Sequence, residues 1–140
     1  MTQSGFESFE VTADYGIRAW APDLSGLFCE AARGLWSLLV EPTGVQAVRA
    51  YPVAVQAADQ ELLLVAWLNE LLYLHETEGM VGREADIHRL TATDLSATIQ
   101  GEPFDPARHR IVGQVKAVTY HDLRVAPTAA GWEARVVVDV

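Results

Sequence analysis

The stretch from Asp59 to Thr77 limits the possible fold more than any other part of the sequence. It is almost continuously apolar over the length of a helix, and no proline or glycine interrupts it. These features favour a helix over a strand. Asp59 can accept hydrogen bonds from the first free backbone amides, and Gly79 provides a stop just beyond the last apolar turn. We therefore predict a helix that begins after Asp59 and ends before Gly79.

This predicted helix is apolar on nearly every side. The residues that share its main apolar face, together with two that widen it, are Leu64, Trp67, Leu68, Leu71, Leu74 and His75, with Leu63 and Leu72. Such a helix must be covered nearly all round by the rest of the protein. It is too short and carries too many glutamates to span a bilayer comfortably, so we expect no membrane association.

Length and composition are consistent with one folded domain over residues 1–140. Half of the residues are hydrophobic, and the net charge is −9. That acidic balance argues against a protein that grips nucleic acid through its phosphates, which requires clustered lysine and arginine. The single cysteine, Cys29, cannot form an internal disulfide and is predicted to be a buried thiol. The first residues lack a basic and an apolar region, so we expect a cytoplasmic location.

The remaining segments predict one more helix and several strands. Residues 24–40 repeat apolar side chains at helical spacing. Strands are predicted over residues 6–12, 17–21, 45–57, 80–91, 95–102, 112–125 and 132–140. Within 45–57, Pro52 indicates an edge strand or a bulge. We therefore expect an α+β protein in which one mixed sheet carries the two main helices on one face.

The residues themselves contain little that indicates catalysis. There is no glycine-rich phosphate loop, no Cys-x-x-Cys pair and no His-x-x-x-His pair, and the four histidines are scattered. Asp14 follows a predicted strand, where an aspartate is more often a simple turn residue. Asp139 is followed only by Val140, whose α-carboxylate adds oxygens of the kind that calcium or magnesium prefers. Spacing alone leaves open whether Asp14 lies near them.

Several segments together resemble the archease family over essentially the whole chain. The matching pieces are Thr12-Ala13-Asp14-Tyr15-Gly16-Ile17, Leu27-Phe28-x-x-Ala31-Ala32, Trp67-Leu68-Asn69-Glu70-Leu71-Leu72-Tyr73-Leu74, Gly101-Glu102, Val115-Lys116-Ala117-Val118-Thr119-Tyr120-His121 and Val138-Asp139-Val140. The two longest of these segments are specific, whereas the Asp-x-Gly turn alone would not be.

The resemblance implies a small α+β protein that serves the tRNA-splicing RNA ligase as a protein cofactor and is not itself an enzyme. Such a protein promotes guanylylation of the ligase by GTP and keeps it turning over. The resemblance also implies a divalent metal, typically calcium, held by Asp14, Asp139 and the terminal carboxylate of Val140. It further suggests that Lys116 and His121 contact the ligase, although a lysine and a histidine on one strand can simply form a solvated face.

One residue departs from the family pattern. The family usually has His-Thr-Ala-Asp, and Val11 stands here where the histidine would be. If that histidine supports the metal or the ligase contact, this protein should bind metal more weakly. Two alternatives remain: a metal-dependent hydrolase built on Asp14, Asp139 and His121, and a scaffold or chaperone for RNA-processing proteins.

Overall fold

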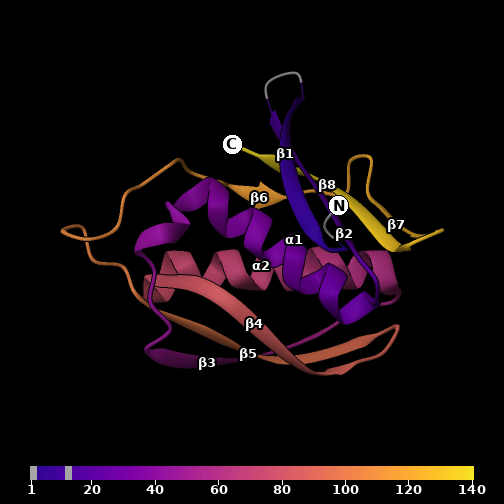
Figure 1. Ribbon diagram of the computed structural model, residues 1–140, viewed down its shortest axis with the longest axis horizontal. Coiled ribbons are helices and arrows are strands. Elements are labelled where there is room, and N and C mark those ends of the chain that lie inside the picture. The colour runs from indigo at the N-terminus through magenta and orange to yellow at the C-terminus, as the bar shows by residue number, and fades with distance from the viewer. Residues whose placement is uncertain (1–2, 12–13) are drawn as a thin grey trace.

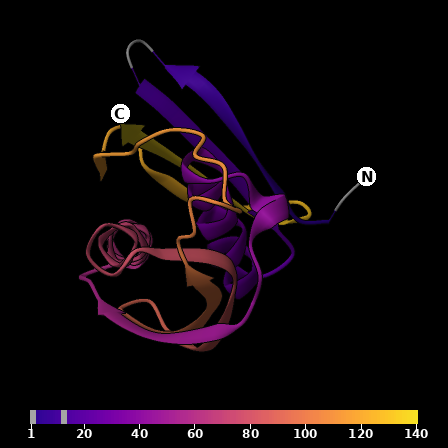
Figure 2. The ribbon, with the colours of Figure 1, turned by 90° about the vertical axis from the view of Figure 1, so that its left-hand side faces the viewer.

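The two helices lie between two antiparallel sheets (Figures 1 and 2). This computed structural model describes residues 3–11 and 14–140. The first sheet has the strand order β1-β2-β8-β6, with β7 also paired to β8, and the second has the order β3-β5-β4. The helices are α1 (Leu24–Leu39) and α2 (Gln60–Glu78), and a short 3-10 helix covers Pro42–Gly44. The strands are β1 (Gly5–Val11), β2 (Asp14–Ala21), β3 (Arg49–Gln56), β4 (Met80–Leu90), β5 (Asp94–Pro103), β6 (Ala117–Val118), β7 (Arg124–Thr128) and β8 (Gly131–Asp139).

The predicted α+β class with two main helices is confirmed, but the single mixed sheet is replaced by two antiparallel ones. Helix α1 packs against β1, β2 and β8 of the first sheet and β4 of the second, and α2 also packs against strands of both. A helix that is apolar all round needs a cover on more than one side, and one sheet covers only one. Two sheets, each presenting one apolar face, meet that need.

Helix α2 begins and ends where the sequence predicts. The Oδ1 atom of Asp59 accepts the Leu62 N–H at 2.9 Å, and Gly79 closes the helix in the left-handed conformation with φ of 65°. The buried residues of this helix lie on more than one side of it: Leu63, Leu64, Val65, Trp67, Leu68, Leu71, Leu72 and Leu74. The side that carries Tyr73 and Glu76 is exposed, so the helix is not covered all round. In the part of the chain that the structure describes, no helix is long and apolar enough to cross a membrane.

Two polar side chains of α2 hold the segment that runs beside the C-terminal strand. Strands β6 and β7 both pair with β8 through one edge, which leaves backbone groups of their other edge to find partners. The side-chain amide of Asn69 accepts the Val118 N–H at 3.0 Å and donates to the Val118 carbonyl at 3.2 Å. The Glu61 carboxylate accepts the Val125 N–H at 3.0 Å. The helix therefore supplies hydrogen-bond partners to this edge at Val118 and Val125.

Three strand predictions need correction. The predicted strand over 112–125 is two short strands, because Asp122 adopts a left-handed turn conformation with φ of 51° between them. The predicted strand over 45–57 begins only at Arg49. Strand β2 already includes Asp14, Tyr15 and Gly16, which the sequence placed in a turn. The prediction for Pro52 is confirmed, since β3 lies at the edge of its sheet.

The thiol of Cys29 lies half-buried against the second sheet. It donates a hydrogen bond to the Ala85 carbonyl at 3.3 Å. Burial raises the pKa of this thiol to about 11. Because the thiolate is the reactive form, Cys29 is an unreactive residue near neutral pH. The sequence predicted a buried thiol, and the structure shows it only partly buried.

Candidate functional site

The pairing of β2 with β8 brings Asp14 and Asp139 to the same end of the first sheet. Tyr15 lies opposite Val138 in this antiparallel ladder. One step further along both strands places Asp14 opposite Asp139. Side chains alternate between the faces of a sheet. Tyr15 and Val138 share the helix-facing side, so both aspartates belong to the outer face. The structure therefore unites two residues that are 125 positions apart in the sequence.

Val140 follows Asp139 directly, and the family resemblance assigns its terminal carboxylate to this group. Its side chain is partly buried and packs against the hydrophobic core, which limits where the end of the chain can lie. The C-terminus lies beside the ends of β1 and β2 in both views of the ribbon (Figures 1 and 2). We refer to Asp14, Asp139 and the terminal carboxylate of Val140 as the acidic end.

The acidic end offers the hard oxygen donors that calcium or magnesium prefers. Its donor set is small, however. Within residues 3–11 and 14–140, no group of three or more histidine, cysteine, aspartate or glutamate side chains is placed to hold a metal ion. Two side-chain carboxylates and the chain terminus could thus supply only part of a coordination shell. Water or a partner protein would have to supply the rest.

Val11 lies directly opposite Asp14 in the ladder between β1 and β2. Directly opposed residues of an antiparallel pair share one face of the sheet and bring their side chains together. The position at which the archease pattern carries a histidine is thus a neighbour of Asp14, and here it provides only an apolar surface. Thr12 and Ala13, which belong to the same sequence motif, lie outside the described residues.

The two predicted partner-contact residues, Lys116 and His121, lie in different places relative to the acidic end. Lys116 is exposed beside the acidic end, and its backbone N–H donates to the Asp139 carbonyl at 2.7 Å. His121 lies in the turn between β6 and β7, and its exposed ring is 3.3 Å from the Asp122 carboxylate. Among the described residues, no hydrogen bond or ion pair joins His121 to Asp14 or Asp139.

A buried ionic network that the sequence did not reveal lies at the end of β5. The side chain of Glu102 is only 4 % exposed, and its carboxylate accepts hydrogen bonds from Arg108, from the Gln46 N–H at 2.6 Å and from His109 Nε2 at 2.9 Å. The hydrogen bond from Arg108, with those from Gln46 and His109, lowers the pKa of Glu102 to about 2. This network anchors the long connection that leads to Lys116.

The hydrogen bonds also determine the protonation of His109. Its Nδ1 atom accepts the Asp105 N–H at 2.8 Å, so the ring proton must be on Nε2, which donates to Glu102. The ring is therefore neutral and fixed from both sides. The sequence signal for this arrangement was weak: a glutamate at the end of a strand, then a histidine seven residues later across a turn that contains a proline.

Comparison with known proteins agrees with the resemblance noted in the sequence. The model of the Archease protein family (MTH1598/TM1083) matches residues 6–140. Protein archease of Methanopyrus kandleri is 33% identical over 138 residues, covering 96% of this chain and 99% of that protein. Protein archease of Thermococcus gammatolerans is 36% identical over 140 residues, covering 96% of this chain and 98% of that protein. These relatives are named as proteins and not as enzymes.

Two solved structures share the fold. The solution structure of Methanobacterium thermoautotrophicum protein 1598 matches with a TM-score of 0.80 and 31% identity, covering 97% of this chain and 99% of that one. The crystal structure of an archease from Thermotoga maritima, described as a possible chaperone, matches with a TM-score of 0.59 and 19% identity, covering 96% of each chain. With the family model and the close relatives across nearly the full length, these similarities show that the chain belongs to the archease family.

Proposed function

We propose that this protein binds a divalent cation, preferably calcium, at the acidic end and activates the RNA ligase of tRNA splicing. In this proposal it promotes guanylylation of the ligase by GTP and repeated turnover, and it does not join RNA itself. The observation that carries the proposal is the meeting of Asp14 and Asp139 on one face of the sheet, at the positions where the family pattern expects metal ligands. Membership of the archease family supports the choice of partner.

The charge of the protein suits such a partner. A ligase that handles RNA must present basic surface to the phosphates. A protein with a net charge of −9 and carboxylates gathered at one end of a sheet is electrostatically complementary to that surface. Lys116, exposed beside the acidic end, is the basic side chain we expect at the contact. It would confer orientation more than affinity.

The proposed activation is a shift between conformations of the ligase. A protein that binds one conformation more tightly than another increases the population of the first. Docking of the acidic end near the nucleotide pocket would favour the conformation in which GTP is aligned for attack. A bound cation would supply positive charge between the carboxylates and the partner. Asp14 and Asp139 would hold that cation through oxygen atoms, and the partner or water would complete its coordination.

The metal site can be tested directly by calorimetry. Asp14→Ala and Asp139→Ala should each weaken calcium binding about tenfold or more, because each removes a charged ligand. Neither residue belongs to the buried core, so both variants should keep the unfolding midpoint of the wild type. Glu76→Ala, which removes an exposed carboxylate on α2, is the matched control. Equal calcium affinity in all four proteins would contradict the assignment of the site.

Val11→His offers a complementary gain-of-function test. A neutral histidine opposite Asp14 could hydrogen-bond and orient its carboxylate, and such support typically contributes about 10- to 100-fold in metal affinity. We expect tighter calcium binding at pH 8, where the ring is neutral, and less gain at pH 5.5, where its charge would repel the cation. Val48→His, at an exposed site elsewhere, should leave the affinity unchanged. An unaltered affinity of Val11→His at pH 8 would show that the opposing position does not support the site.

The ligase function is tested by multiple-turnover RNA joining with the purified ligase, GTP and RNA. The ligase alone should complete about one round and stall, and substoichiometric wild-type protein should restore many rounds. Asp14→Ala and Asp139→Ala should abolish this rescue, Lys116→Ala should weaken it, and Glu76→Ala should rescue fully.

Two other outcomes would point elsewhere. Metal-dependent nucleotide hydrolysis by the isolated protein, lost in Asp14→Ala, would identify a hydrolase. Full rescue by both aspartate variants would overturn the proposed role of the acidic end.

A further inference from the structure

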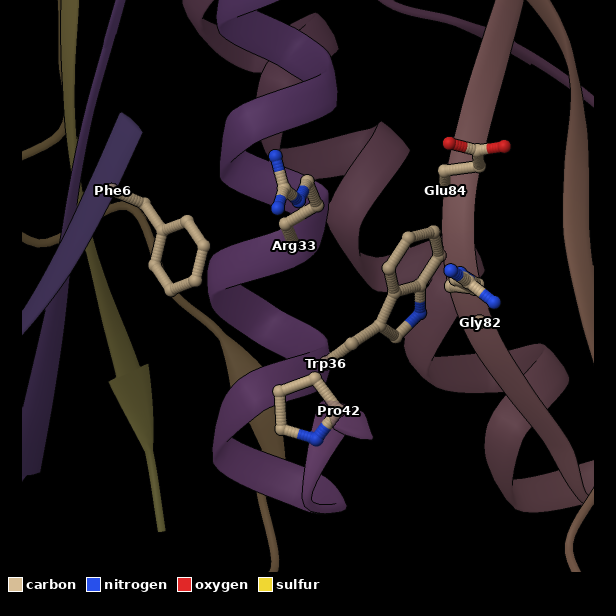
Figure 3. Close-up of a pocket in the computed structure, with 7 residues that line it drawn as sticks. Phe6, Arg33, Trp36, Pro42, Gly82 and Glu84 are labelled. Carbon is tan, nitrogen blue, oxygen red and sulfur yellow. The ribbon is translucent and has the colours of Figure 1, made fainter. Parts of the chain in front are cut away.

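A cavity of about 340 Å³ opens between α1 and β4, away from the acidic end. It is lined by Phe6, Arg33, Trp36, Pro42, Arg83 and Glu84 (Figure 3). Phe6 lies opposite Ala19 in the first sheet, whereas the acidic end begins at the other end of β1, where Val11 lies opposite Asp14. The cavity is therefore a separate feature of the molecule. The proposed function does not use it.

The indole of Trp36 forms one wall of this cavity with an unused donor. The residue is only 5 % exposed, and within the described part of the chain its Nε1 atom has no hydrogen-bond partner. A buried donor without a partner is destabilising, and native structures usually pair such groups. The ring packs closely on the bare backbone of Gly82, where an added Cβ would lie 2.2 Å from a ring atom. Close packing thus fixes the indole in the cavity wall, with its Nε1 atom covered.

A β-bulge places Arg83 in the cavity wall. Gly82 pairs with Gly101 and Glu84 with Gln100, so Arg83 is an extra residue in β4 that has no opposite partner in β5. Bulges redirect side chains and occur often beside functional sites. The guanidinium of Arg83 makes one long hydrogen bond, to the Val45 carbonyl at 3.5 Å. Among residues 3–11 and 14–140, no carboxylate forms an ion pair with it.

Arg33 provides a second cation with spare donors. Figure 3 shows its side chain between the rings of Phe6 and Trp36. Its Nη1 atom donates to Glu30 at 2.8 Å, and its guanidinium carbon lies 6.0 Å from the centre of the Phe6 ring. A guanidinium has five N–H donors, so most remain available. The planar guanidinium group of arginine can donate two parallel hydrogen bonds to one carboxylate.

We propose that this cavity binds a small planar carboxylate. Arg83 and Arg33 would bind the carboxylate group, and the flat part would lie against the aromatic walls of Phe6 and Trp36. Glu84 also lines the cavity, which favours a ligand with one negative charge over one with more. Because Trp36 Nε1 is covered and the ring is packed against Gly82, the indole would contact the ligand through its ring and not as a hydrogen-bond donor. The net charge of −9 provides no general attraction for anions, so binding must come from these local groups.

The test is an NMR titration of the full chain with benzoate, in which the indole N–H signals of the four tryptophans are followed. Trp36→Phe assigns the relevant signal. We expect a saturable shift of the Trp36 signal with benzoate and none with benzamide, which has nearly the same shape but no charge. The double variant Arg33→Ala, Arg83→Ala should weaken binding by roughly 10- to 100-fold, the loss expected for hydrogen bonds to a charged group.

The control double variant is Arg49→Ala, Arg124→Ala, which changes the net charge equally at exposed positions on β3 and β7. It should leave benzoate binding unchanged. Arg83→Gln alone removes the arginine that forms no ion pair with any described residue, and it should also weaken binding. The proposal would be overturned if the Trp36 signal did not saturate, if benzamide bound equally well, or if both double variants lost affinity to the same extent.

Discussion

Replacing Leu68 with alanine is expected to lower the free energy of unfolding by about 2–5 kcal/mol, because the side chain loses its burial and leaves a cavity. Leu68 is 0 % exposed and lies in the middle of α2, between the two sheets. The surrounding strands cannot move in to fill the cavity left by Leu68→Ala without disturbing the packing of α2 against the two sheets. Denaturant unfolding followed by circular dichroism measures the change. Leu71→Ala should behave similarly, since Leu71 is also fully buried.

The matched control is Tyr73→Ala on the same helix. Tyr73 is 58 % exposed, so its replacement removes little buried surface. Its effect should stay within about 0.5 kcal/mol, the usual range for surface substitutions. A loss well under 1 kcal/mol for Leu68→Ala would mean that α2 is not enclosed between the sheets.

Local signals explain why α2 could be predicted so closely. Its cap at Asp59, its stop at Gly79 and its apolar run are all neighbours in the sequence. The arrangement of the strands depends instead on pairing between distant segments, such as β2 with β8 and β3 with β5. No local pattern distinguishes one mixed sheet from two antiparallel ones. The need to cover α2 on more than one side was visible in the sequence, and two sheets meet it, while the side that carries Tyr73 and Glu76 stays exposed.

The candidate site was likewise predictable only in its local features and not in the pairing of distant segments. The family resemblance selected Asp14 and Asp139 one by one, while spacing could not bring them together. Their meeting follows from the register of β2 against β8, in which Ile17 lies opposite Val136 and both side chains are buried. A slip of one residue would turn the side chains of one strand to the other face of the sheet. The cavity beside Trp36 was invisible in the sequence. It depends on a bulge in β4 and on the approach of α1, and neither has a sequence signature of its own.

The Glu102 network was missed for a further reason. A glutamate, an arginine and a histidine in an acidic chain are unremarkable until a turn folds the last two back onto the first. The resemblance included Gly101-Glu102 but gave it no role. In the structure Glu102 is the second-last residue of β5. Its carboxylate accepts hydrogen bonds from the loop before β3, through Gln46, and from the connection after β5, through Arg108 and His109. One buried charge therefore joins two loops.

Glu102→Gln should destabilise the protein by roughly 3 kcal/mol at pH 7. This is the low end of the range for breaking a buried ion pair, because Arg108 is half-exposed and partly screened by solvent. The amide keeps the shape of the carboxylate but removes its charge and turns N–H groups toward donors. Asp105→Asn is the control: it removes the other, more exposed ion pair of Arg108 and should cost much less. Equal losses would show that charge on Arg108, and not the buried position of Glu102, stabilises these loops.

The same substitution should change how stability depends on pH. The pKa of Glu102 is about 2 in the folded protein and near its ordinary value of 4.5 in the unfolded chain. Between these values the unfolded chain binds more protons, so stability rises with pH across this window. The contribution of Glu102 is complete above about pH 4.5 and disappears as the pH falls toward 2. We therefore expect the difference in unfolding free energy between wild type and Glu102→Gln, measured by urea unfolding at pH 6, 4.5 and 3.5, to shrink at the lowest pH. Parallel profiles for the two proteins over this range would mean that the carboxylate of Glu102 titrates as it does in the unfolded chain, and that its hydrogen bonds do not hold it in the charged form.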